Sequence, residues 1–113
     1  MSDSCIFCRI VAGTIPSTTV AANEHAVAFR DLHPQAPVHV LVVPREHVDS
    51  LWELVDGALA GELLLAAAEV ARSKGLARGF RVITTARRDG GQEVEHLHLH
   101  VVGGKRLGRM LPS

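Results

Sequence analysis

Aromatic residues are scarce in this chain: its 113 residues include no tyrosine, one tryptophan and three phenylalanines. Proteins that bind single-stranded nucleic acid stack its bases on aromatic side chains, so we expect no nucleic-acid partner. Long apolar runs are also missing. The longest, residues 63–71, is interrupted by Glu69, whereas a helix needs about 20 apolar residues to cross a bilayer. We therefore expect no membrane partner.

Cysteine is limited to Cys5 and Cys8, and two cysteines this close together cannot build the framework of a disulfide-rich secreted domain. The first ten residues contain an early acid and lack the apolar segment of a secretory signal. A reducing, cytoplasmic location is therefore the default expectation. Apolar residues make up 47% of the chain, which excludes a disordered protein, and the length fits a single domain over residues 1–113.

Charge is balanced in total but unevenly distributed. Residues 1–71 contain 3 basic and 9 acidic side chains, whereas residues 72–113 contain 9 basic and 3 acidic ones. Two interpretations remain open at this point. In the first, the two halves form solvated faces that attract each other or a second copy of the chain. In the second, the basic half faces an anion such as phosphate.

Five short segments have the composition of β-strands. The third is almost wholly apolar, which is typical of a strand buried on both faces, and proline follows it directly. The last contains three histidines alternating with apolar residues. The strands are predicted at residues 18–22, 26–30, 38–43, 80–85 and 94–102.

A long helix is predicted between the third and fourth strands. Apolar residues recur at helical spacing from residue 51 onward, and Ser50 with Glu53 forms a capping box at the start. Asp49 is a second candidate for the N-cap, Gly57 is a candidate break, and Gly75 ends the helix. Strands, then a helix, then strands predict an α+β fold, with the helix packed on a mostly antiparallel sheet.

Three histidines alternate with apolar residues in the last predicted strand, at His96, His98 and His100. Alternate side chains of a strand share a face, so the imidazoles are expected on the accessible face, roughly 6.5–7 Å apart at successive positions. The first and third then lie about 13 Å apart, too far for one metal ion to bind all three. At most one or two of them then bind a metal. An alternative is that one neutral imidazole attacks phosphorus as a nucleophile while its neighbours orient it and stabilise charge. A polar outer face that happens to be rich in histidine is the third interpretation.

Cys5 and Cys8 form a C-x-x-C motif, which by itself fits a redox pair, incidental thiols or half of a zinc site. Zinc needs two further ligands to complete a tetrahedral site. His47 follows the end of the central strand and His96 begins the triad segment, so both could reach one edge of the sheet. The best set of four zinc ligands is therefore Cys5, Cys8, His47 and His96. A redox pair and incidental thiols remain open as alternatives.

Two segments resemble the histidine triad hydrolases. GGQEVEHLHLHVVGG at residues 90–104 is similar to the signature of that family, and FRDLHPQAPVHVLVVPREH at residues 29–47 is similar to its N-terminal half-site. The resemblance spans nearly the whole chain and is strongest to the nucleoside phosphoramidase branch, the Hint-like proteins. It implies the same α+β fold, a purine nucleotide substrate and hydrolysis of nucleoside phosphoramidates through a nucleotidyl-histidine intermediate.

The resemblance also implies a role for individual residues. His98 matches the nucleophile, His100 the phosphate contact, His39 a histidine near the triad and Asp31 the carboxylate that binds the ribose hydroxyls. The apolar clamp for the nucleobase matches Ile6, Phe7, Ile15, Phe29 and Leu32. The pair preceding the triad matches Gln92 and Glu93. The ligands of one structural Zn²⁺ per chain match Cys5, Cys8, His47 and His96.

This chain departs from the family pattern at a few positions. Thr85 stands where relatives usually have an asparagine near the phosphate, which places that contact in doubt, and Glu95 replaces a common aromatic residue. Arg87 and Arg88 add two positive charges to the adjacent turn, where they either favour more anionic substrates or are simply solvated.

Members of this branch are homodimers, and the helix and the C-terminal tail with Met110 and Leu111 are the expected interface. Two other functions stay open at this point: hydrolysis of dinucleoside polyphosphates with the same nucleophile, and a zinc-stabilised nucleotide-binding module with little turnover.

Overall fold

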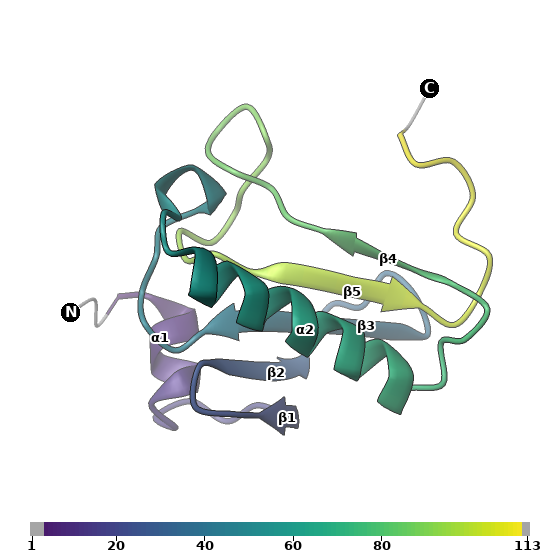
Figure 1. Cartoon of the computed structure of the whole chain (residues 1–113), viewed down its shortest axis with the longest axis horizontal. Coiled ribbons are helices and arrows are strands. Elements are labelled where there is room, and N and C mark those ends of the chain that lie inside the picture. Colours follow the sequence, from purple (N-terminus) through teal and green to yellow (C-terminus); the bar gives the residue numbers. More distant parts are fainter. Residues whose placement is uncertain (1–3, 112–113) are drawn as a thin grey trace.

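The computed structural model describes residues 4–111; the ends of the predicted domain, residues 1–3 and 112–113, lie outside the described residues. An antiparallel sheet forms the centre of the molecule, with a long helix across it (Figure 1). The elements are α1 (Ile6–Val11), β1 (Thr19–Ala22), β2 (Ala26–Arg30), β3 (Val38–Pro44), the 3-10 helix η1 (Leu51–Glu53), α2 (Gly57–Ser73), β4 (Phe80–Ile83) and β5 (Leu99–Gly103). Within the described residues, no helix combines the length and the apolar composition needed to cross a bilayer.

The five strands lie in the order β1-β2-β3-β5-β4, and every neighbouring pair is antiparallel. β3 is the central strand, which explains its almost continuous apolar sequence. Its neighbour β5 carries the end of the triad, and the register places Leu41 opposite His100 and His39 opposite Val102. The predicted α+β fold with a mostly antiparallel sheet is confirmed.

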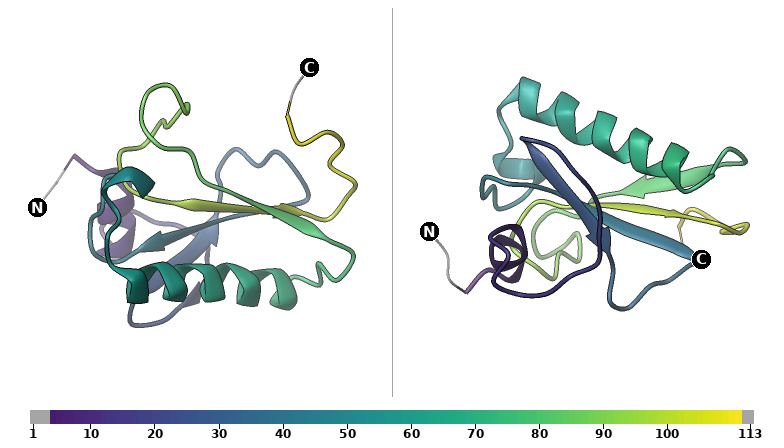
Figure 2. Two further views of the ribbon diagram at one scale, coloured as in Figure 1. Left: turned by 45° about the horizontal axis from the view of Figure 1, so that its top comes forward. Right: turned by 90° about the horizontal axis from the view of Figure 1, so that it is seen from below.

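The two faces of the sheet are covered differently. Val40 and Val42 of β3 pack with Leu63 and Val70 of α2 in one cluster, whereas Leu41 and Val43 pack with Phe7 of α1 in another. This division follows from the alternation of side chains along a strand. Figure 2 shows α1 and α2 on opposite sides of the sheet. The face that bears α1 is the one on which the histidines gather.

The start of the long helix differs from the prediction. Ser50 is an N-cap, but of the short helix η1 and without the reciprocal bonds of a capping box: its Oγ accepts from the Trp52 N–H at 3.1 Å and donates to the Glu53 carboxylate. α2 starts afresh at the expected break, Gly57, with Asp56 as its N-cap. The prediction of Asp49 as an N-cap is wrong, because the Asp49 carboxylate accepts a hydrogen bond from a histidine ring instead.

The triad strand is shorter than predicted. β5 begins only at Leu99, so His96 and His98 precede it in an irregular segment, and the predicted strand over residues 94–98 is wrong. The Leu97 N–H donates to the Val48 carbonyl at 2.7 Å, which holds this segment outside the regular ladder.

The predicted accessibility of the imidazoles is also wrong for two of them. His96 is completely buried and His98 is 6% exposed, while His100 is half-buried. Phe7 of α1 covers both buried rings, with its centroid 5.9 Å from that of His96 and 5.0 Å from that of His98. The packing of α1, which comes from a distant part of the chain, therefore buries two imidazoles that the local pattern placed on an accessible face.

Candidate active site and metal site

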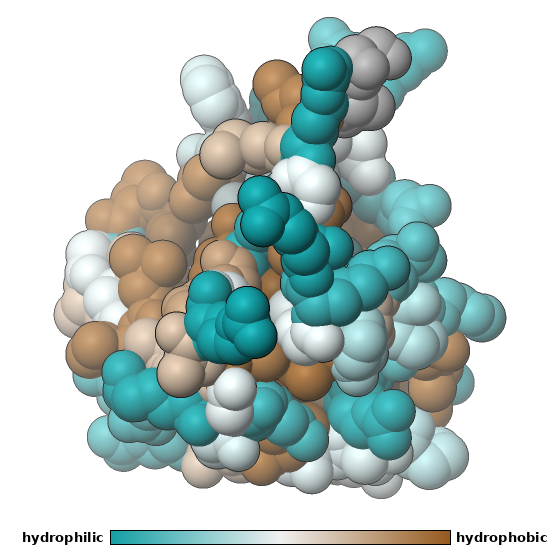
Figure 3. All heavy atoms as spheres, turned by 90° about the vertical axis from the view of Figure 1, so that its right-hand side faces the viewer, coloured by the Kyte–Doolittle hydropathy of each residue, from teal (hydrophilic) through white to brown (hydrophobic). Residues whose placement is uncertain are grey.

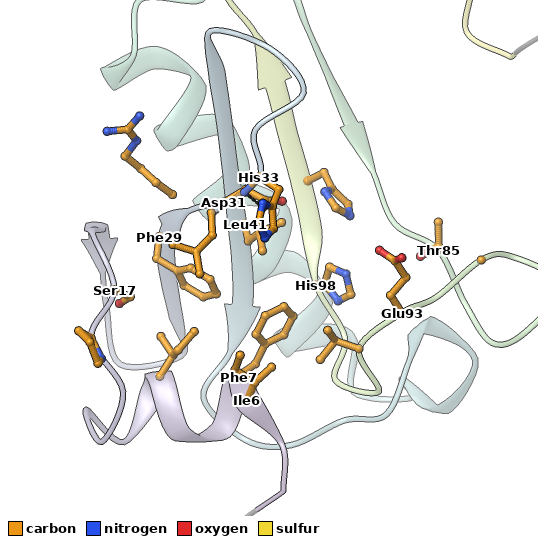
Figure 4. A pocket seen from close by; sticks show the side chains of 17 residues that line it. Ile6, Phe7, Ser17, Phe29, Asp31, His33, Leu41, Thr85, Glu93 and His98 are labelled. Atoms are coloured by element: carbon orange, nitrogen blue, oxygen red, sulfur yellow. Dashed lines mark hydrogen bonds between the residues drawn. The ribbon is translucent and has the colours of Figure 1, made fainter.

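A cavity of about 350 Å³ opens on the α1 face beside the triad (Figure 4). α1 and the end of β2 form its apolar part, and the residues around the triad form its polar part. The cavity brings together nine of the residues singled out from the sequence: Ile6, Phe7, Phe29, Asp31, Leu32, Thr85, Glu93, His98 and His100.

Three predicted residues do not line this cavity: Ile15, His39 and Gln92. The Gln92 amide is engaged within the loop, where Nε2 donates to the carbonyls of Asp49 at 2.7 Å and Val94 at 2.9 Å. Its Oε1 accepts from the Arg87 N–H at 2.7 Å. Gln92 therefore holds the loop in shape.

Sequence reasoning missed several lining residues. Leu41 could have been found, since it alternates with the residues that face α2 and so belongs to the same face as His100. Ile10 belongs to α1 and Arg30 to the end of β2, whereas the remaining ones depend on loop conformation, which local sequence does not specify. The missed residues are Ile10, Pro16, Ser17, Arg30, His33, Leu41, Gly91 and Val94.

The tautomer of His98 follows from its one hydrogen bond to the backbone. Its Nδ1 lies 2.7 Å from the His96 carbonyl oxygen, and because a carbonyl only accepts, Nδ1 must carry the proton. Nε2 is then the nitrogen with a free lone pair. Thr84 Oγ1 donates to the His98 carbonyl at 2.8 Å and fixes the backbone at the same point. The ring that lines the cavity thus has the unprotonated nitrogen that a nucleophile requires.

A chain of hydrogen bonds likewise orients His100. The Gln35 N–H donates to His39 Nδ1 at 3.0 Å, so the proton of His39 is on Nε2, which donates to His100 Nδ1 at 2.8 Å. The remaining proton of His100 is on Nε2, where it can donate to a ligand in the cavity. His39 therefore acts behind the cavity by setting the tautomer of its neighbour.

Asp31 lies beside this chain of rings. Its Oδ1 accepts from the His33 N–H at 2.9 Å, and its Oδ2 lies 3.3 Å from His39 Nε2. Asp31, His39 and His100 place three potential metal-binding atoms within 4.8 Å of one another. However, both nitrogens of His39 are already committed to hydrogen bonds, one as acceptor and one as donor. This group is consequently a hydrogen-bonded array with no free His39 lone pair for a metal.

Burial, together with the neighbouring His98 and His39, lowers the pKa of His100 from 6.5 to about 4. The ring is therefore neutral near pH 7. A neutral imidazole still donates one hydrogen bond to a phosphate oxygen. It also leaves the cavity without a fixed positive charge at this position.

This pKa shift predicts a loss of stability in acid. Between about pH 6.5 and pH 4 the unfolded chain takes up a proton at His100 and the folded protein does not. The free energy of unfolding should therefore fall as the pH drops through this window, by about 3 kcal/mol at most, and level off below it. Urea unfolding across the window, compared for the wild type and His100→Asn, measures the effect. Because both proteins keep the Cys and His cluster, its titration cancels in the difference, and an identical pH dependence would contradict the shift.

Cys5, Cys8, His47 and His96 form a second cluster, at the edge of the sheet beside α1, with one ligand atom each and all four atoms within 4.8 Å. Cys5 Sγ lies 3.3 Å from His96 Nδ1, and Cys8 Sγ lies 3.1 Å from His47 Nδ1 and 3.4 Å from His96 Nδ1. Tetrahedral zinc with bonds of about 2.0–2.3 Å separates its ligand atoms by about 3.5 Å. The spacing of the cluster fits a tetrahedral metal ion of this kind.

The histidine tautomers in this cluster fit a metal as well. His96 Nε2 donates to the Pro44 carbonyl at 2.9 Å, and His47 Nε2 donates to Asp49 Oδ1 at 2.7 Å. Both Nδ1 atoms are left with lone pairs directed at the thiols, which is the usual arrangement for ligating histidines. Burial also lowers the pKa of His96, which keeps that ring neutral and able to bind a cation.

The thiols argue against a redox pair. Partial burial and the neighbouring Cys5 raise the pKa of Cys8 to about 11, whereas a reactive thiol needs a lowered pKa. A bound dication reverses this effect, because a coordinating thiol loses its proton to the metal. The four side chains could hold a metal ion, and the backbone carbonyl of one of them, His96, also accepts the hydrogen bond that orients His98.

The basic residues of the C-terminal half lie elsewhere. None of the arginines and lysines in residues 72–113 lines the triad cavity; Arg78, Lys105 and Arg106 surround a separate one at the α2–β4 turn. Figure 3 views this end of the molecule, and hydrophilic side chains gather on it. Arg87 forms an ion pair with Glu53 at 2.7 Å and lies over the Trp52 ring, outside the triad cavity.

The same fold and sequence pattern occur in known proteins. Protein HitA of Neisseria gonorrhoeae is 42% identical, over 89% of this chain and 96% of its own. The purine nucleoside phosphoramidase of Escherichia coli K12 is 39% identical, over 98% of this chain and 96% of its own. A HIT family hydrolase from Clostridium thermocellum superposes with a TM-score of 0.94 at 36% identity, covering 98% of this chain and all of that one. The sequence profile of the HIT domain matches residues 12–107, and the chain therefore belongs to the HIT domain family.

Proposed function

We propose that this protein is a nucleotidyl hydrolase that cleaves purine nucleoside 5′-phosphoramidates to a nucleoside monophosphate and an amine. One observation carries the proposal: His98 Nδ1 is tied to a backbone carbonyl, which leaves Nε2 with its lone pair on a cavity of nucleotide size. Membership of the HIT domain family supports a hydrolase activity. The name of the E. coli relative, which is 39% identical, supports the substrate class.

In this proposal the two halves of the cavity bind different parts of the substrate. The base packs among the apolar side chains of α1 and β2, with Phe7 and Phe29 in edge contact at 5.5 Å between centroids. The ribose hydroxyls donate to Asp31. The phosphate then lies at the polar end, where His98 and His100 line the cavity.

The reaction proceeds in two displacements. His98 Nε2 attacks the α-phosphorus as the phosphorus–nitrogen bond breaks, and the amine leaves with one added proton. The His100 Nε2–H donates to an equatorial oxygen of phosphorus, which carries negative charge in the transition state. Water then attacks phosphorus, the bond to His98 breaks, and the nucleoside monophosphate is released.

The metal in this proposal is structural zinc. Cys5, Cys8, His47 and His96 would hold it, and it would tie the N-terminal helix to the segment that presents His98. No step of the reaction runs through the ion. The chain's own contribution is the His96 carbonyl, which keeps the proton of His98 on Nδ1.

A substrate panel tests the proposed reaction. We expect faster release of adenosine monophosphate from adenosine 5′-phosphoramidate than from diadenosine polyphosphates, measured as kcat/KM by chromatography. The opposite order would assign the protein to dinucleoside polyphosphate hydrolysis. Nucleotide binding without release of product from either substrate would indicate a binding module and overturn the proposal.

We also propose a homodimer, because the sheet ends in an edge strand with exposed apolar residues. β4 pairs only with β5, and Phe80, Val82 and Ile83 on it are each 40–42% exposed. Leu64 and Leu65 of α2 are about 60% exposed as well. An unpaired strand edge beside apolar side chains is a site of association.

Light scattering should therefore give about 24 kDa, twice the 12.1 kDa of one chain. Val82→Glu places a charge on the apolar edge and should yield the monomer with the sheet intact by circular dichroism. Val55→Glu is the matched control, since Val55 is 94% exposed but lies between η1 and α2, away from the edge strand. A wild-type mass of about 12 kDa would reject the dimer.

A further inference from the structure

We propose that the carboxyl group of Glu93 is the acid that protonates the departing amine; this inference rests on the proposed function. The two-step reaction requires such an acid, because an amine leaves phosphorus far more readily with an added proton than as an anion. Neither His98 nor His100 is suited to this role in the tautomers that the structure assigns to them.

Glu93 is placed on the correct side of the cavity. It lines the cavity together with Thr85 and Val94 from the loop before the triad. In Figure 4 His98 lies between Glu93 and the part of the cavity formed by Phe29 and Asp31. If base and ribose occupy that part, the group leaving phosphorus extends toward Glu93.

The Glu93 carboxylate has no partner in the protein. Within residues 4–111 it forms no hydrogen bond and no ion pair, whereas the adjacent Gln92 makes three hydrogen bonds to the backbone. The other carboxylate of the cavity, Asp31, accepts from the His33 N–H and lies 3.3 Å from His39. An unpaired acidic group in a binding cavity is available to a ligand.

The other polar groups of the cavity are poorer acids. The neutral His100 ring, with its pKa near 4, holds its last proton as a hydrogen-bond donor only. The hydroxyls of Ser17 and Thr85 and the guanidinium of Arg30 do not release a proton near neutral pH. His33 is next but one to Asp31 along the chain and belongs with the ribose side. Glu93 is the titratable group left beside the leaving amine.

A carboxyl group in this position can act in both displacements. In the proposed first displacement the carboxyl group of Glu93 carries a proton on the side of the phosphate from which the amine departs. That proton passes to nitrogen as the phosphorus–nitrogen bond breaks, leaving a carboxylate. The carboxylate then takes a proton from the water that attacks the nucleotidyl-histidine, which restores the acid for the next turnover.

Two substrates with different leaving groups test this role. An adenosine 5′-phosphoramidate of an alkylamine needs a proton on nitrogen, whereas adenosine 5′-(p-nitrophenyl phosphate) releases a stable phenolate without one. For Glu93→Gln we expect the rate of the first displacement, measured as release of the amine or the phenolate in a single turnover, to fall by about 100-fold or more on the first substrate and to stay within about threefold on the second.

Glu95→Gln is the matched control, because Glu95 is an exposed carboxylate like Glu93 and lies two residues away, but does not line the cavity. It should behave as wild type on both substrates. Equal loss on both substrates in Glu93→Gln would indicate a structural role, and loss on neither would exclude proton donation; either result overturns the inference. Wild-type protein that cleaves neither substrate would overturn the proposed function itself, which distinguishes the two failures.

Discussion

Replacing His98 with alanine should abolish turnover while leaving nucleotide binding intact. The variant loses the proposed nucleophile, the imidazole whose Nε2 is left unprotonated at the cavity, so the phosphorus–nitrogen bond to this residue cannot form. We expect kcat on adenosine phosphoramidate to fall by at least roughly 1,000-fold, the loss typical of removing a covalent nucleophile. Calorimetry with adenosine monophosphate should show binding within about tenfold of wild type, since the apolar walls and Asp31 remain.

His25→Ala is the control for this experiment, because His25 lies in the β1–β2 turn, is paired with Glu24 at 3.3 Å and does not line the cavity. Its activity should match wild type. Mass spectrometry of quenched wild-type reactions should locate a nucleotidyl group on the peptide that contains His98. A variant that keeps more than a few per cent of the wild-type rate, or an adduct on another residue, would contradict the assignment of the nucleophile.

Replacing Cys5 with serine should remove the metal and unfold the protein at a much lower temperature. Cys5 is buried, caps α1 and lies 3.3 Å from His96 Nδ1, so its loss detaches the N-terminal helix from the triad segment. Loss of a metal is among the few single changes that cost more than about 4 kcal/mol of unfolding free energy. For a domain of this size we expect the unfolding temperature to fall by roughly 15 °C or more.

Metal analysis should give about one zinc per wild-type chain and almost none for Cys5→Ser. A chelator added to wild type should lower the melting temperature by a similar amount, and His25→Ala should retain its zinc. The idea fails if Cys5→Ser keeps its metal, or if the metal-free wild type melts unchanged. Because the His96 carbonyl orients His98, loss of the metal should also reduce kcat without a matching change in nucleotide binding.

Local sequence patterns predicted much of the fold. β3 was recognisable because a strand buried on both faces must be apolar at every position, and the structure buries it between α1 and α2. Gly75 was predicted to end α2 and has φ of +72°, a conformation that favours glycine. Such features depend on a residue and its near neighbours, so sequence alone specifies them.

The segment before the triad shows where this reasoning fails. Alternating histidine and apolar residues predicted a strand from residue 94, yet β5 starts at Leu99. The pattern correctly identified Leu97, Leu99 and Val101 as buried. It could not reveal that Leu97 hydrogen-bonds to Val48 or that Phe7 covers the two preceding rings, since both partners come from distant parts of the chain.

The sequence by itself determined which side chains this protein can use: three histidines at alternate positions, two cysteines one helical turn apart, and an apolar central strand. Only the tertiary structure decided what each imidazole does. The partners that set the protons are the carbonyls of Pro44 and His96, the carboxylate of Asp49 and the N–H of Gln35. An isolated imidazole exchanges between two tautomers of similar energy. Packing of distant segments supplies the hydrogen bond that selects one tautomer. That choice separates the proposed metal ligand from the proposed nucleophile, and the nucleophile from the proposed hydrogen-bond donor.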